Sequence, residues 1–394
     1  MKYKLSDIAE FNPRESIKKG SVAKKVAMDK LQPFCRDIPE YEYAAFTGGT
    51  KFRNGDTIMA RITPCLENGK TAKVNVLEDD EVGFGSTEYI VFRAKENVAD
   101  EDYLYYLVCS PLVRDPAIKS MVGSSGRQRV QTDVVQNLEI DLPDLDTQRK
   151  SGGVLKALDD KIALNNAINK NLEEQAQTLF KSWFVDFAPN DGVMPSDWVI
   201  GTVDDLAKEI ICGKTPSTKV TEYYGSDIPF ITIPDMHGKT YVVTTERYLS
   251  NHGANSQAKK TLPKNSICVS CIGTAGLVAL VASDSQTNQQ VNSIIPKDGY
   301  SPYYIYLLMQ TLSEVINRLG QSGSTIVNLN KAQFGKIQVV IPTVASMQEF
   351  DELVSPLFSL ILENQRENIW LSALRETLLP KLLSGQLDVS NINI

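Results

Sequence analysis

The sequence predicts an α+β protein built from two tandem-repeated mixed α/β domains, each followed by a long helix. Three observations predict this fold class. Similar segments recur in the same order about 200 residues apart, short β-type runs alternate with turn residues, and each repeat ends in a helical stretch of about 40 residues. A chain of 394 residues is too long for a single core and is expected to form two or three domains.

The repeat is clearest in two helical stretches, LEEQAQTLFKSWF from Leu172 and LSALRETLLPKLL from Leu371, whose apolar residues align. Further matches follow the same order: LSDIAEF with VDDLAKE, GDTIMARI with NSICVSCI, YLYYL with YIYLL, SSGRQRV with QSGSTIV, and LEIDLP with IQVVIP. We therefore interpret the chain as two diverged copies of one unit.

The matches place the domain boundaries. We expect a first domain at 1–146, a central helix at 147–187, a second domain at 188–345, and a distal helix with a C-terminal tail at 346–394. Strands are predicted at 57–62, 89–93, 138–142, 266–272, 276–281 and 337–341, and shorter helices at 102–114 and 302–319. The central helix is expected to begin near Asp146 or Thr147, and Ser346 to Glu349 predicts a capping box at the start of the distal helix.

The apolar spacing of the long helices alternates between three and four residues, as in a coiled-coil seam. Asn165 and Asn169 interrupt the first seam, and Asn364 and Asn368 interrupt the second at equivalent positions. If the helices pair antiparallel about a pseudo-twofold axis, Asn165 faces Asn368 and Asn169 faces Asn364, and this polar layer would fix the register. The alternative is that these asparagines face solvent. Two prolines, at 356 and 380, predict kinks in the second helix.

Composition restricts the function classes only weakly. The formal net charge of −7 argues against DNA binding, but a local basic surface is sufficient for DNA contact in a large protein. No apolar run reaches the roughly 18 residues needed to span a bilayer, and the N-terminus lacks the apolar segment of a secretory signal. Six scattered cysteines fit reduced thiols, so we expect a cytoplasmic protein.

Motifs for catalysis are weak in this sequence. Gly213-Lys214-Thr215 resembles the end of a phosphate-binding loop but lacks the glycine that such a loop needs at position 208. Cys268-Val-Ser-Cys271 has the spacing of a zinc or redox motif, yet it lies in an alternating strand without a second such pair, so buried thiols are the preferred interpretation. We expect no catalytic residues and no metal site in this chain.

Several strings resemble the specificity (HsdS) subunits of type I restriction–modification systems. LFKSWFVDF with Pro189 and a following MPSDW is similar to the junction between the central helix and the second target-recognition domain of that family. LLPKLLSGQLDV resembles the end of its distal helix, and GDTIMARI with Gly69-Lys70 resembles its strand–turn–strand segment. Leu142-Pro143 with Gln148, and Ile341-Pro342 with Gln348, are similar to the start of its helices. Asn265-Ser266 departs from the family's Gly-Asp.

The resemblance implies a non-catalytic, sequence-specific DNA-recognition subunit. Each domain would read one half of a bipartite, asymmetric site in double-stranded DNA, while the coiled coil sets the half-site spacing. The coiled coil would also dock two methyltransferase subunits, and motor–nuclease subunits would join them. S-adenosylmethionine, ATP and Mg would belong to these partner subunits, so this chain is expected to hold no cofactor. No membrane partner is expected.

The sequence identifies candidate DNA contacts only as polar or basic loop residues. In the first domain these are Thr47, Lys51, Arg53, Lys70, Arg127, Gln128 and Arg129. In the second they are Lys239, Lys259, Lys260, Thr274, Gln289, Gln290 and Ser322. Arg127 and Arg129 are the preferred candidates because arginine pairs bidentately with guanine, although both fit ordinary surface arginines equally well.

Partner-binding candidates are the apolar residues at the helix ends, expected to be exposed: Trp183, Phe184, Phe187 and Leu382. The alternative is that they close the helix pair internally. Two other function classes remain open. A standalone DNA methyltransferase would need an adenine-methyltransferase motif, which Tyr300-Ser-Pro-Tyr303 does not provide, and a coiled-coil scaffold without DNA specificity would not need two diverged domains.

Overall fold

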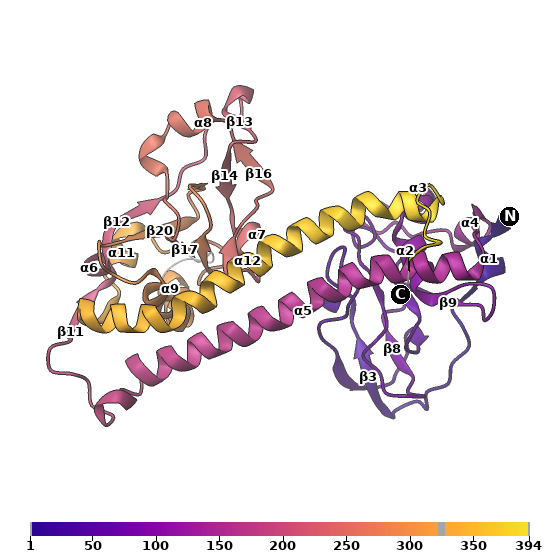
Figure 1. Cartoon of the computed structure of the whole chain (residues 1–394), viewed down its shortest axis with the longest axis horizontal. Coiled ribbons are helices and arrows are strands. Elements are labelled where there is room, and N and C mark those ends of the chain that lie inside the picture. Colours follow the sequence, from indigo (N-terminus) through magenta and orange to yellow (C-terminus); the bar gives the residue numbers. More distant parts are fainter. Residues whose placement is uncertain (1, 322–327, 393–394) are drawn as a thin grey trace. The chain divides into compact units, whose positions relative to one another are not determined.

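The structure of the chain is a computed structural model, and it describes residues 2–321 and 328–392. The chain folds into two compact units (Figure 1). The first is formed by Met1–Ala163 with Ile369–Ile394, and the second by Leu164–Asn368. The long helices α5 (Leu145–Phe184) and α12 (Val344–Leu383) therefore each contribute one part to each unit.

Short strands and short helices form the globular part of the first unit. Its strands are β1 (Lys2–Lys4), β2 (Ala9–Phe11), β3 (Val22–Val26), β4 (Glu42–Ala45), β5 (Lys51–Phe52), β6 (Thr57–Ala60), β7 (Thr71–Lys73), β8 (Gly83–Gly85), β9 (Tyr89–Ala94) and β10 (Glu139–Asp141). Its short helices are α1 (Leu5–Ile8), the 3₁₀ helix η1 (Met28–Lys30), α2 (Glu101–Cys109), α3 (Pro111–Lys119) and α4 (Thr132–Gln136).

The β structure of the first unit is mixed. One sheet has the strand order β2-β9-β6-β7, another has β4-β3-β8-β5, and β1 pairs with β10. The first sheet is antiparallel, with Met59 opposite Ile90, whereas β3 and β8 run parallel in the second. Successive β9 residues enter different cores: Val91 joins the cluster with Phe52, while Ile90 joins the cluster of α2. This period of two is that of a strand buried on both faces.

Helix α2 lies between the first sheet and the long helices. It contacts β6, β7 and β9 on one side. On the other side its residues share a buried cluster with Leu155 of α5 and with Leu379 and Leu382 of α12. Because the long helices contribute to this core, the first unit needs both its own domain and one part of each long helix.

The second unit repeats this plan with different residues. Its strands are β11 (Val199–Thr202), β12 (Ala207–Cys212), β13 (Tyr224–Gly225), β14 (Ile228–Ile231), β15 (Tyr241–Val242), β16 (Arg247–Leu249), β17 (Ile267–Ser270), β18 (Val278–Val281), β19 (Gln286–Thr287), β20 (Val291–Pro296) and β21 (Gln338–Ile341). Its short helices are η2 (Ala188–Asn190), α6 (Val203–Leu206), η3 (Thr221–Tyr223), α7 (Ile233–Met236), α8 (Asn251–Asn255), η4 (Ala258–Lys260), α9 (Pro302–Thr311), α10 (Ser313–Gln321) and α11 (Lys331–Gly335).

The sheets of the second unit have the orders β12-β20-β17-β18-β15 and β13-β16-β14-β19, with β11 paired to β21. The order β12-β20-β17-β18 repeats β2-β9-β6-β7, and the parallel pair β14–β19 repeats β3–β8. Helix α9 packs on β17 and β18, as α2 packs on β6 and β7. The structure therefore confirms the predicted fold class of two mixed-sheet domains, each followed by a long helix.

The strand predictions agree with the structure to within a few residues, but two helix predictions are wrong. The stretch predicted as one helix at 102–114 is divided into α2 and α3, because Ser110 is extended and Pro111 begins the next helix. A residue before proline disfavours the helical conformation. The stretch predicted at 302–319 is likewise divided, into α9 and α10, at Leu312.

One predicted helix start agrees with the structure and one needs correction. Helix α5 begins at Leu145, one residue from the predicted start near Asp146. Asp144 caps it: its carboxylate accepts hydrogen bonds from the Thr147 amide at 2.9 Å and the Thr147 hydroxyl at 3.0 Å. At the start of α12 the Thr343 hydroxyl accepts from the Ser346 amide at 3.2 Å, so Ser346 lies inside the helix rather than at its cap. Each cap satisfies an otherwise unpaired amide.

Other sequence features have a local explanation. Asn265, which departs from the family's glycine, has a φ of +66°, and the matching Gly55 has a φ of +87°. Asparagine tolerates this left-handed conformation, so the turn is retained.

Gln148 at the start of α5 is buried. It accepts a hydrogen bond from the Asp100 amide and donates to the Val98 and Pro143 carbonyls. Gln348, which matches Gln148 in the sequence motif, is exposed and therefore does not occupy an equivalent buried position. Helix α12 continues through Pro356 and Pro380; the kinks there stay a prediction.

Candidate nucleic-acid interface

Two loops of the first unit are bonded to one another through their backbones. Residues 61–66 follow β6, residues 122–130 precede α4, and we call these two segments the paired loops. Arg129 forms isolated β-bridges to both Val122 and Ile62. The Thr63 amide donates to the Gln128 carbonyl at 3.0 Å, and the Val130 amide donates to the Arg61 carbonyl at 2.9 Å. The backbone on both sides of Arg129 is therefore fixed.

The side chain of Arg129 is held by a carboxylate. Its Nε donates to both oxygens of Glu88 at 3.0 Å, and its Nη2 donates to Glu88 Oε1 at 2.7 Å. Arg61 lies 3.8 Å from the other oxygen of Glu88. The hydrogen bond from Arg129 lowers the pKa of Glu88, although burial opposes this shift. The carboxylate is therefore ionised at neutral pH and keeps the guanidinium in one orientation.

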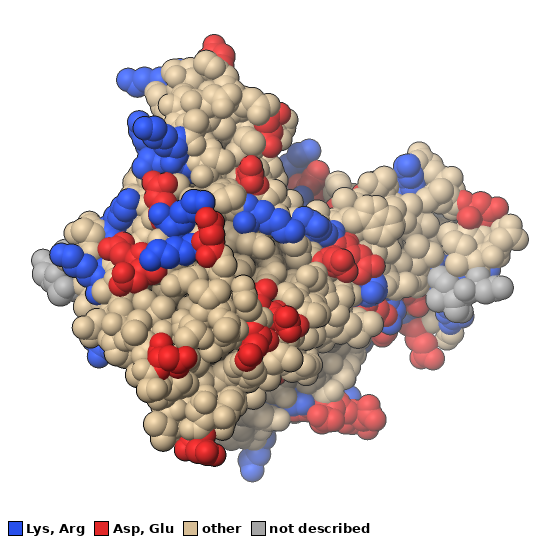
Figure 2. Space-filling view, turned by 60° about the vertical axis from the view of Figure 1, so that its left-hand side comes forward, with Lys and Arg blue, Asp and Glu red and all other residues tan. Residues whose placement is uncertain are grey.

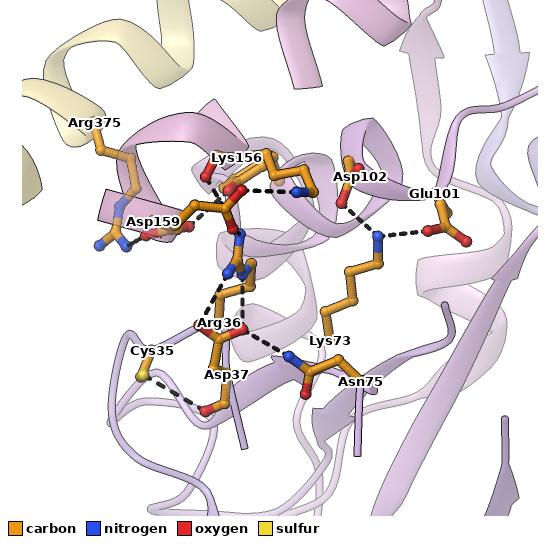
Figure 3. Close-up of polar contacts among 12 residues, drawn as sticks. Cys35, Arg36, Asp37, Lys73, Asn75, Glu101, Asp102, Lys156, Asp159 and Arg375 are labelled. Carbon is orange, nitrogen blue, oxygen red and sulfur yellow. Dashed lines mark hydrogen bonds and ion pairs between the residues drawn. The ribbon is translucent and has the colours of Figure 1, made fainter. Parts of the chain in front are cut away.

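A network of charged side chains fixes the first domain to the long helices (Figure 3). Arg36 bonds Asp37 through two hydrogen bonds of 2.9 Å, and it contacts α5 through the Lys156 carbonyl at 3.3 Å and the Asp160 carboxylate at 2.7 Å. Nearby, Lys73 of β7 forms ion pairs with Glu101 and Asp102 of α2. Arg36 thus connects a loop of the domain with α5, and Lys73 connects β7 with α2.

A second ion pair lies beside this network, between the two long helices. Arg375 of α12 donates to Asp159 of α5, and Tyr106 of α2 donates to the same carboxylate at 2.6 Å. The side chains of Asp159 and Arg375 are only 5% and 12% exposed. This one carboxylate therefore joins α2, α5 and α12.

The long helices pair through asparagines in the second unit. Asn165 donates to Asn368 at 2.9 Å, and Asn364 donates to Asn169 at 2.8 Å. As the residue number rises along α5, its partner's number falls along α12, so the helices are antiparallel here. These are the two pairs expected from the seam. Asn165, Asn169 and Asn364 are buried, whereas the alternative interpretation expected these side chains to face solvent.

Comparison with known proteins identifies the family of this fold. Over residues 1–174 and 195–369, the chain matches the family model described as the type I restriction modification DNA specificity domain. The chain belongs to this family. It is 33% identical over 404 residues to the type I restriction enzyme HindI specificity subunit of Haemophilus influenzae, covering 85% of this chain and 87% of that protein.

Other relatives agree with this assignment. The type I restriction enzyme MjaIX specificity subunit of Methanocaldococcus jannaschii is 30% identical over 191 residues, which cover 47% of this chain and 44% of that protein. The crystal structure of a type I restriction-modification system S subunit from M. genitalium has the same fold, with a TM-score of 0.60, 12% identity, and coverage of 97% and 95%. The chain is thus a DNA specificity subunit and has no catalytic role of its own.

The candidate DNA-contact residues of the first target-recognition domain differ in exposure and in whether their side chains already bond other protein groups. Thr47 and Arg127 are exposed, and Gln128 is half-buried. Besides Arg129, three lysine or arginine side chains have partners within the protein: Lys51 donates to the Glu15 carbonyl at 2.9 Å, Arg53 to the Glu15 carboxylate at 2.7 Å, and Lys70 to the Met28 carbonyl at 2.9 Å. Sequence reasoning did not identify Glu88 or Arg61, because the contacts of Glu88 with Arg129 and with Arg61 join separate segments of the chain.

The second target-recognition domain has a corresponding pair of segments. Ile272 bridges Asn328, and the Leu329 amide donates to the Cys271 carbonyl at 2.9 Å. Lys259 and Thr274 are exposed, and Lys239 is half-buried. Lys260 donates to the Cys212 carbonyl, Gln289 accepts from Thr215, and Gln290 accepts from Asn288. Ser322 lies outside the described residues.

Charges of both signs occur on the surface of the specificity subunit. Figure 2 shows Lys and Arg side chains gathered with Asp and Glu side chains among them.

Among the described residues, no group of three or more His, Cys, Asp or Glu side chains is arranged to hold a metal ion. The described helices also include none that is both long and apolar enough to cross a membrane. Cys268 and Cys271 are buried, and burial raises the pKa of each thiol to about 12.

The expected exposure of the apolar helix ends is wrong for two residues. Phe184 is buried in the second unit, where its ring lies 4.8 Å from Tyr304 and 5.0 Å from Phe350, and Leu382 is buried in the first unit. Trp183 and Phe187 are partly buried against the same core as Phe184. The domain cores extend to the ends of the helices and cover these side chains. Trp370 of α12, which the sequence prediction did not include, is 61% exposed.

Proposed function

We propose that each target-recognition domain of this specificity subunit reads one half of a bipartite, asymmetric sequence in double-stranded DNA. The observation that carries the proposal is the duplication: the two units share a sheet topology but differ in the residues of their loops. Base edges specify a sequence, and phosphate contacts mainly position the protein. Two diverged domains on one chain can therefore recognise two different half-sites.

The long helices are proposed to set the spacing between the half-sites. Each unit contains one part of α5 and one part of α12, so both domains are built onto the same two helices. The pairs Asn165–Asn368 and Asn169–Asn364 support a single register, because a buried polar layer disfavours shifted pairings. A pseudo-twofold relation between the domains belongs to this proposal.

The helices are also proposed to dock two adenine-methyltransferase subunits, which motor–nuclease subunits join for restriction. S-adenosylmethionine, ATP and Mg would be held by those subunits, and the complex would act in the cytoplasm. The formal net charge of −7 is consistent with a division of DNA contacts between this chain and the methyltransferases. Trp183 and Phe187 remain partner-binding candidates, whereas the burial of Phe184 and Leu382 suits them to a structural role.

Mapping methylated adenines tests the proposed function. The chain is co-expressed with the methyltransferase subunit of its source cell in a host without methylation, and the host genome is sequenced for methylated adenines. We expect one motif with two specified halves and a constant unspecified spacer. The chain alone, or the methyltransferase alone, should methylate no motif. A continuous motif, or the same motif without this chain, would overturn the proposal.

The same preparation discriminates the two alternative function classes. A standalone methyltransferase would bind S-adenosylmethionine as an isolated chain and methylate without a partner. A coiled-coil scaffold would leave the methylation pattern unchanged when its loops are mutated. Isothermal titration of the isolated chain with S-adenosylmethionine, and the methylation map of an Arg129→Ala variant, separate these outcomes from the proposed one.

A further inference from the structure

The geometry of Arg129 leaves one edge of its guanidinium available. Nε and Nη2 donate to Glu88, so both N–H groups of Nη1 and the second N–H of Nη2 point away from the carboxylate. The Arg129 side chain is 46% exposed and that of Glu88 is 24% exposed. The edge of the guanidinium formed by Nη1 and Nη2 is therefore accessible, whereas the edge formed by Nε and Nη2 is occupied by Glu88.

This available edge has the donor spacing that suits guanine. The O6 and N7 atoms of guanine are two adjacent acceptors in the major groove, and a guanidinium binds them through two parallel hydrogen bonds. A phosphate is a poorer match here, because the Glu88 carboxylate beside Arg129 would repel its negative charge. A neutral base edge with two acceptors avoids this repulsion.

We propose that Glu88 is a positioning residue that holds Arg129 in the orientation to bind the O6 and N7 atoms of one guanine in the half-site read by the first domain. The inference rests on the proposed function and names one base contact of that same site. The β-bridges from Arg129 to Val122 and Ile62 fix its backbone, and Glu88 fixes its side chain. Less rotamer freedom is then lost on binding.

Arg127 provides a matched comparison in the same loop. It lies two residues away, it is exposed, and its side chain has no polar partner among residues 2–321 and 328–392. Gly126 beside it has a φ of +76°, which places Arg127 at a tight turn. An arginine without a fixed orientation suits a phosphate contact, which adds affinity but little sequence information.

The test uses the complex of this chain with its methyltransferase and a duplex that carries the mapped motif. Each guanine of the motif is replaced in turn by 7-deazaguanine, which lacks the N7 acceptor, and the Kd is measured. For the unsubstituted chain we expect one position, in one half-site, at which the replacement weakens binding about tenfold. Arg129→Lys, which keeps the charge but not the fork, should remove this sensitivity.

The other variants separate positioning from general affinity. Glu88→Gln should reduce the sensitivity to 7-deazaguanine at the same position, because an amide can accept from Arg129 through one oxygen only. Arg127→Ala should weaken binding to the motif duplex and to the duplex with 7-deazaguanine by the same factor. The ratio of the two Kd values should therefore stay unchanged. Thermal unfolding of each variant, expected to match the unsubstituted chain within a few degrees, controls for misfolding.

Two kinds of failure are distinguishable. If the unsubstituted complex prefers its motif over unrelated DNA but no guanine is sensitive, or if Arg129→Lys keeps the sensitivity, the role of Glu88 and Arg129 is overturned and the proposed function stands. If the complex shows no preference for any motif, the proposed function itself fails, and this inference fails with it.

Discussion

Asp159 of α5 accepts hydrogen bonds from Arg375 of α12 and from Tyr106 of α2, so one buried carboxylate joins three helices of the first unit. The positions that match this pair in the sequence repeat are Phe358 and Ala176, which are fully buried in the second unit. Phe358 stacks on Tyr303 with ring centroids 4.4 Å apart. At these matched positions the first domain contacts the helices through charged groups, and the second contacts them through aromatic packing.

Removal of one member of the Asp159–Arg375 pair should destabilise the first unit strongly. Arg375→Ala is expected to lower its free energy of unfolding by about 3 kcal/mol, because an uncompensated buried charge remains. The double variant Asp159→Asn, Arg375→Met leaves no unpaired charge at this position. Its free energy of unfolding should therefore decrease clearly less than that of Arg375→Ala. Urea unfolding, followed by hydrogen exchange of the α2 amides, measures both. Equal losses in the two variants would show that the charges do not carry the attachment.

Leucine at Asn169 and Asn364 should stabilise the helix pair and reduce its specificity of register. Buried apolar residues strengthen a seam, whereas a polar layer selects one alignment at a cost in stability. We expect a higher unfolding temperature for the double variant. Cross-linking of cysteines introduced one heptad out of register should increase at the same time. An unchanged cross-linking pattern would mean that other contacts fix the register.

Glu173 of α5 should make the stability of the second unit depend on pH. Burial raises the pKa of Glu173, and the hydrogen bond from Thr240 only partly offsets this shift. The folded state therefore holds the proton more tightly than the unfolded state, and stability decreases as the pH rises above the ordinary value of 4.5. Glu173→Gln should raise the unfolding temperature at pH 7 and leave it nearly unchanged at pH 4.

The neighbouring Glu174 is exposed and provides the matched control for this experiment. Glu174→Gln should change the unfolding temperature little at either pH, because an exposed carboxylate loses no solvation on folding. If Glu173→Gln has the same small effect at pH 7, the burial of this carboxylate does not penalise its charged form.

The aromatic cluster at the end of α5 should be essential for the second unit. Phe184 contacts Phe180, Trp198, Tyr304 and Phe350, so Phe184→Ala is expected to cost about 3–5 kcal/mol of unfolding free energy. Trp370→Ala removes an exposed aromatic from α12 and should change the stability by less than about 0.5 kcal/mol. Guanidinium unfolding compares the two, and similar costs would contradict the assignment of Phe184 to the core.

Much of the fold was predictable because it depends on local patterns. The alternation of three and four residues identified the seam and paired Asn165 with Asn368, and the repeat identified two domains of one topology. The same patterns could not locate helix breaks or caps. Ser110 interrupts a continuous apolar pattern, and Asp144 and Thr343 cap the long helices although Ser346 has the better capping signature.

The candidate site was less predictable because its contacts join segments that are distant in sequence. Arg129 was identified as a DNA-contact candidate from its residue type, but nothing local indicates that it bonds Glu88, 41 residues earlier. The burial of Phe184 depends in the same way on Tyr304 and Phe350, which belong to other elements. Residue chemistry alone could not distinguish an exposed apolar helix end from one that the domain covers.

The methylation map of the chain with its methyltransferase tests the central claim most directly. The claim is that two target-recognition domains read separate half-sites and that the paired helices keep those half-sites at one spacing. The account predicts methylated adenines in a single two-part motif whose unspecified spacer has the same length at every site. A motif of one continuous block, or halves separated by a variable number of base pairs, would contradict it.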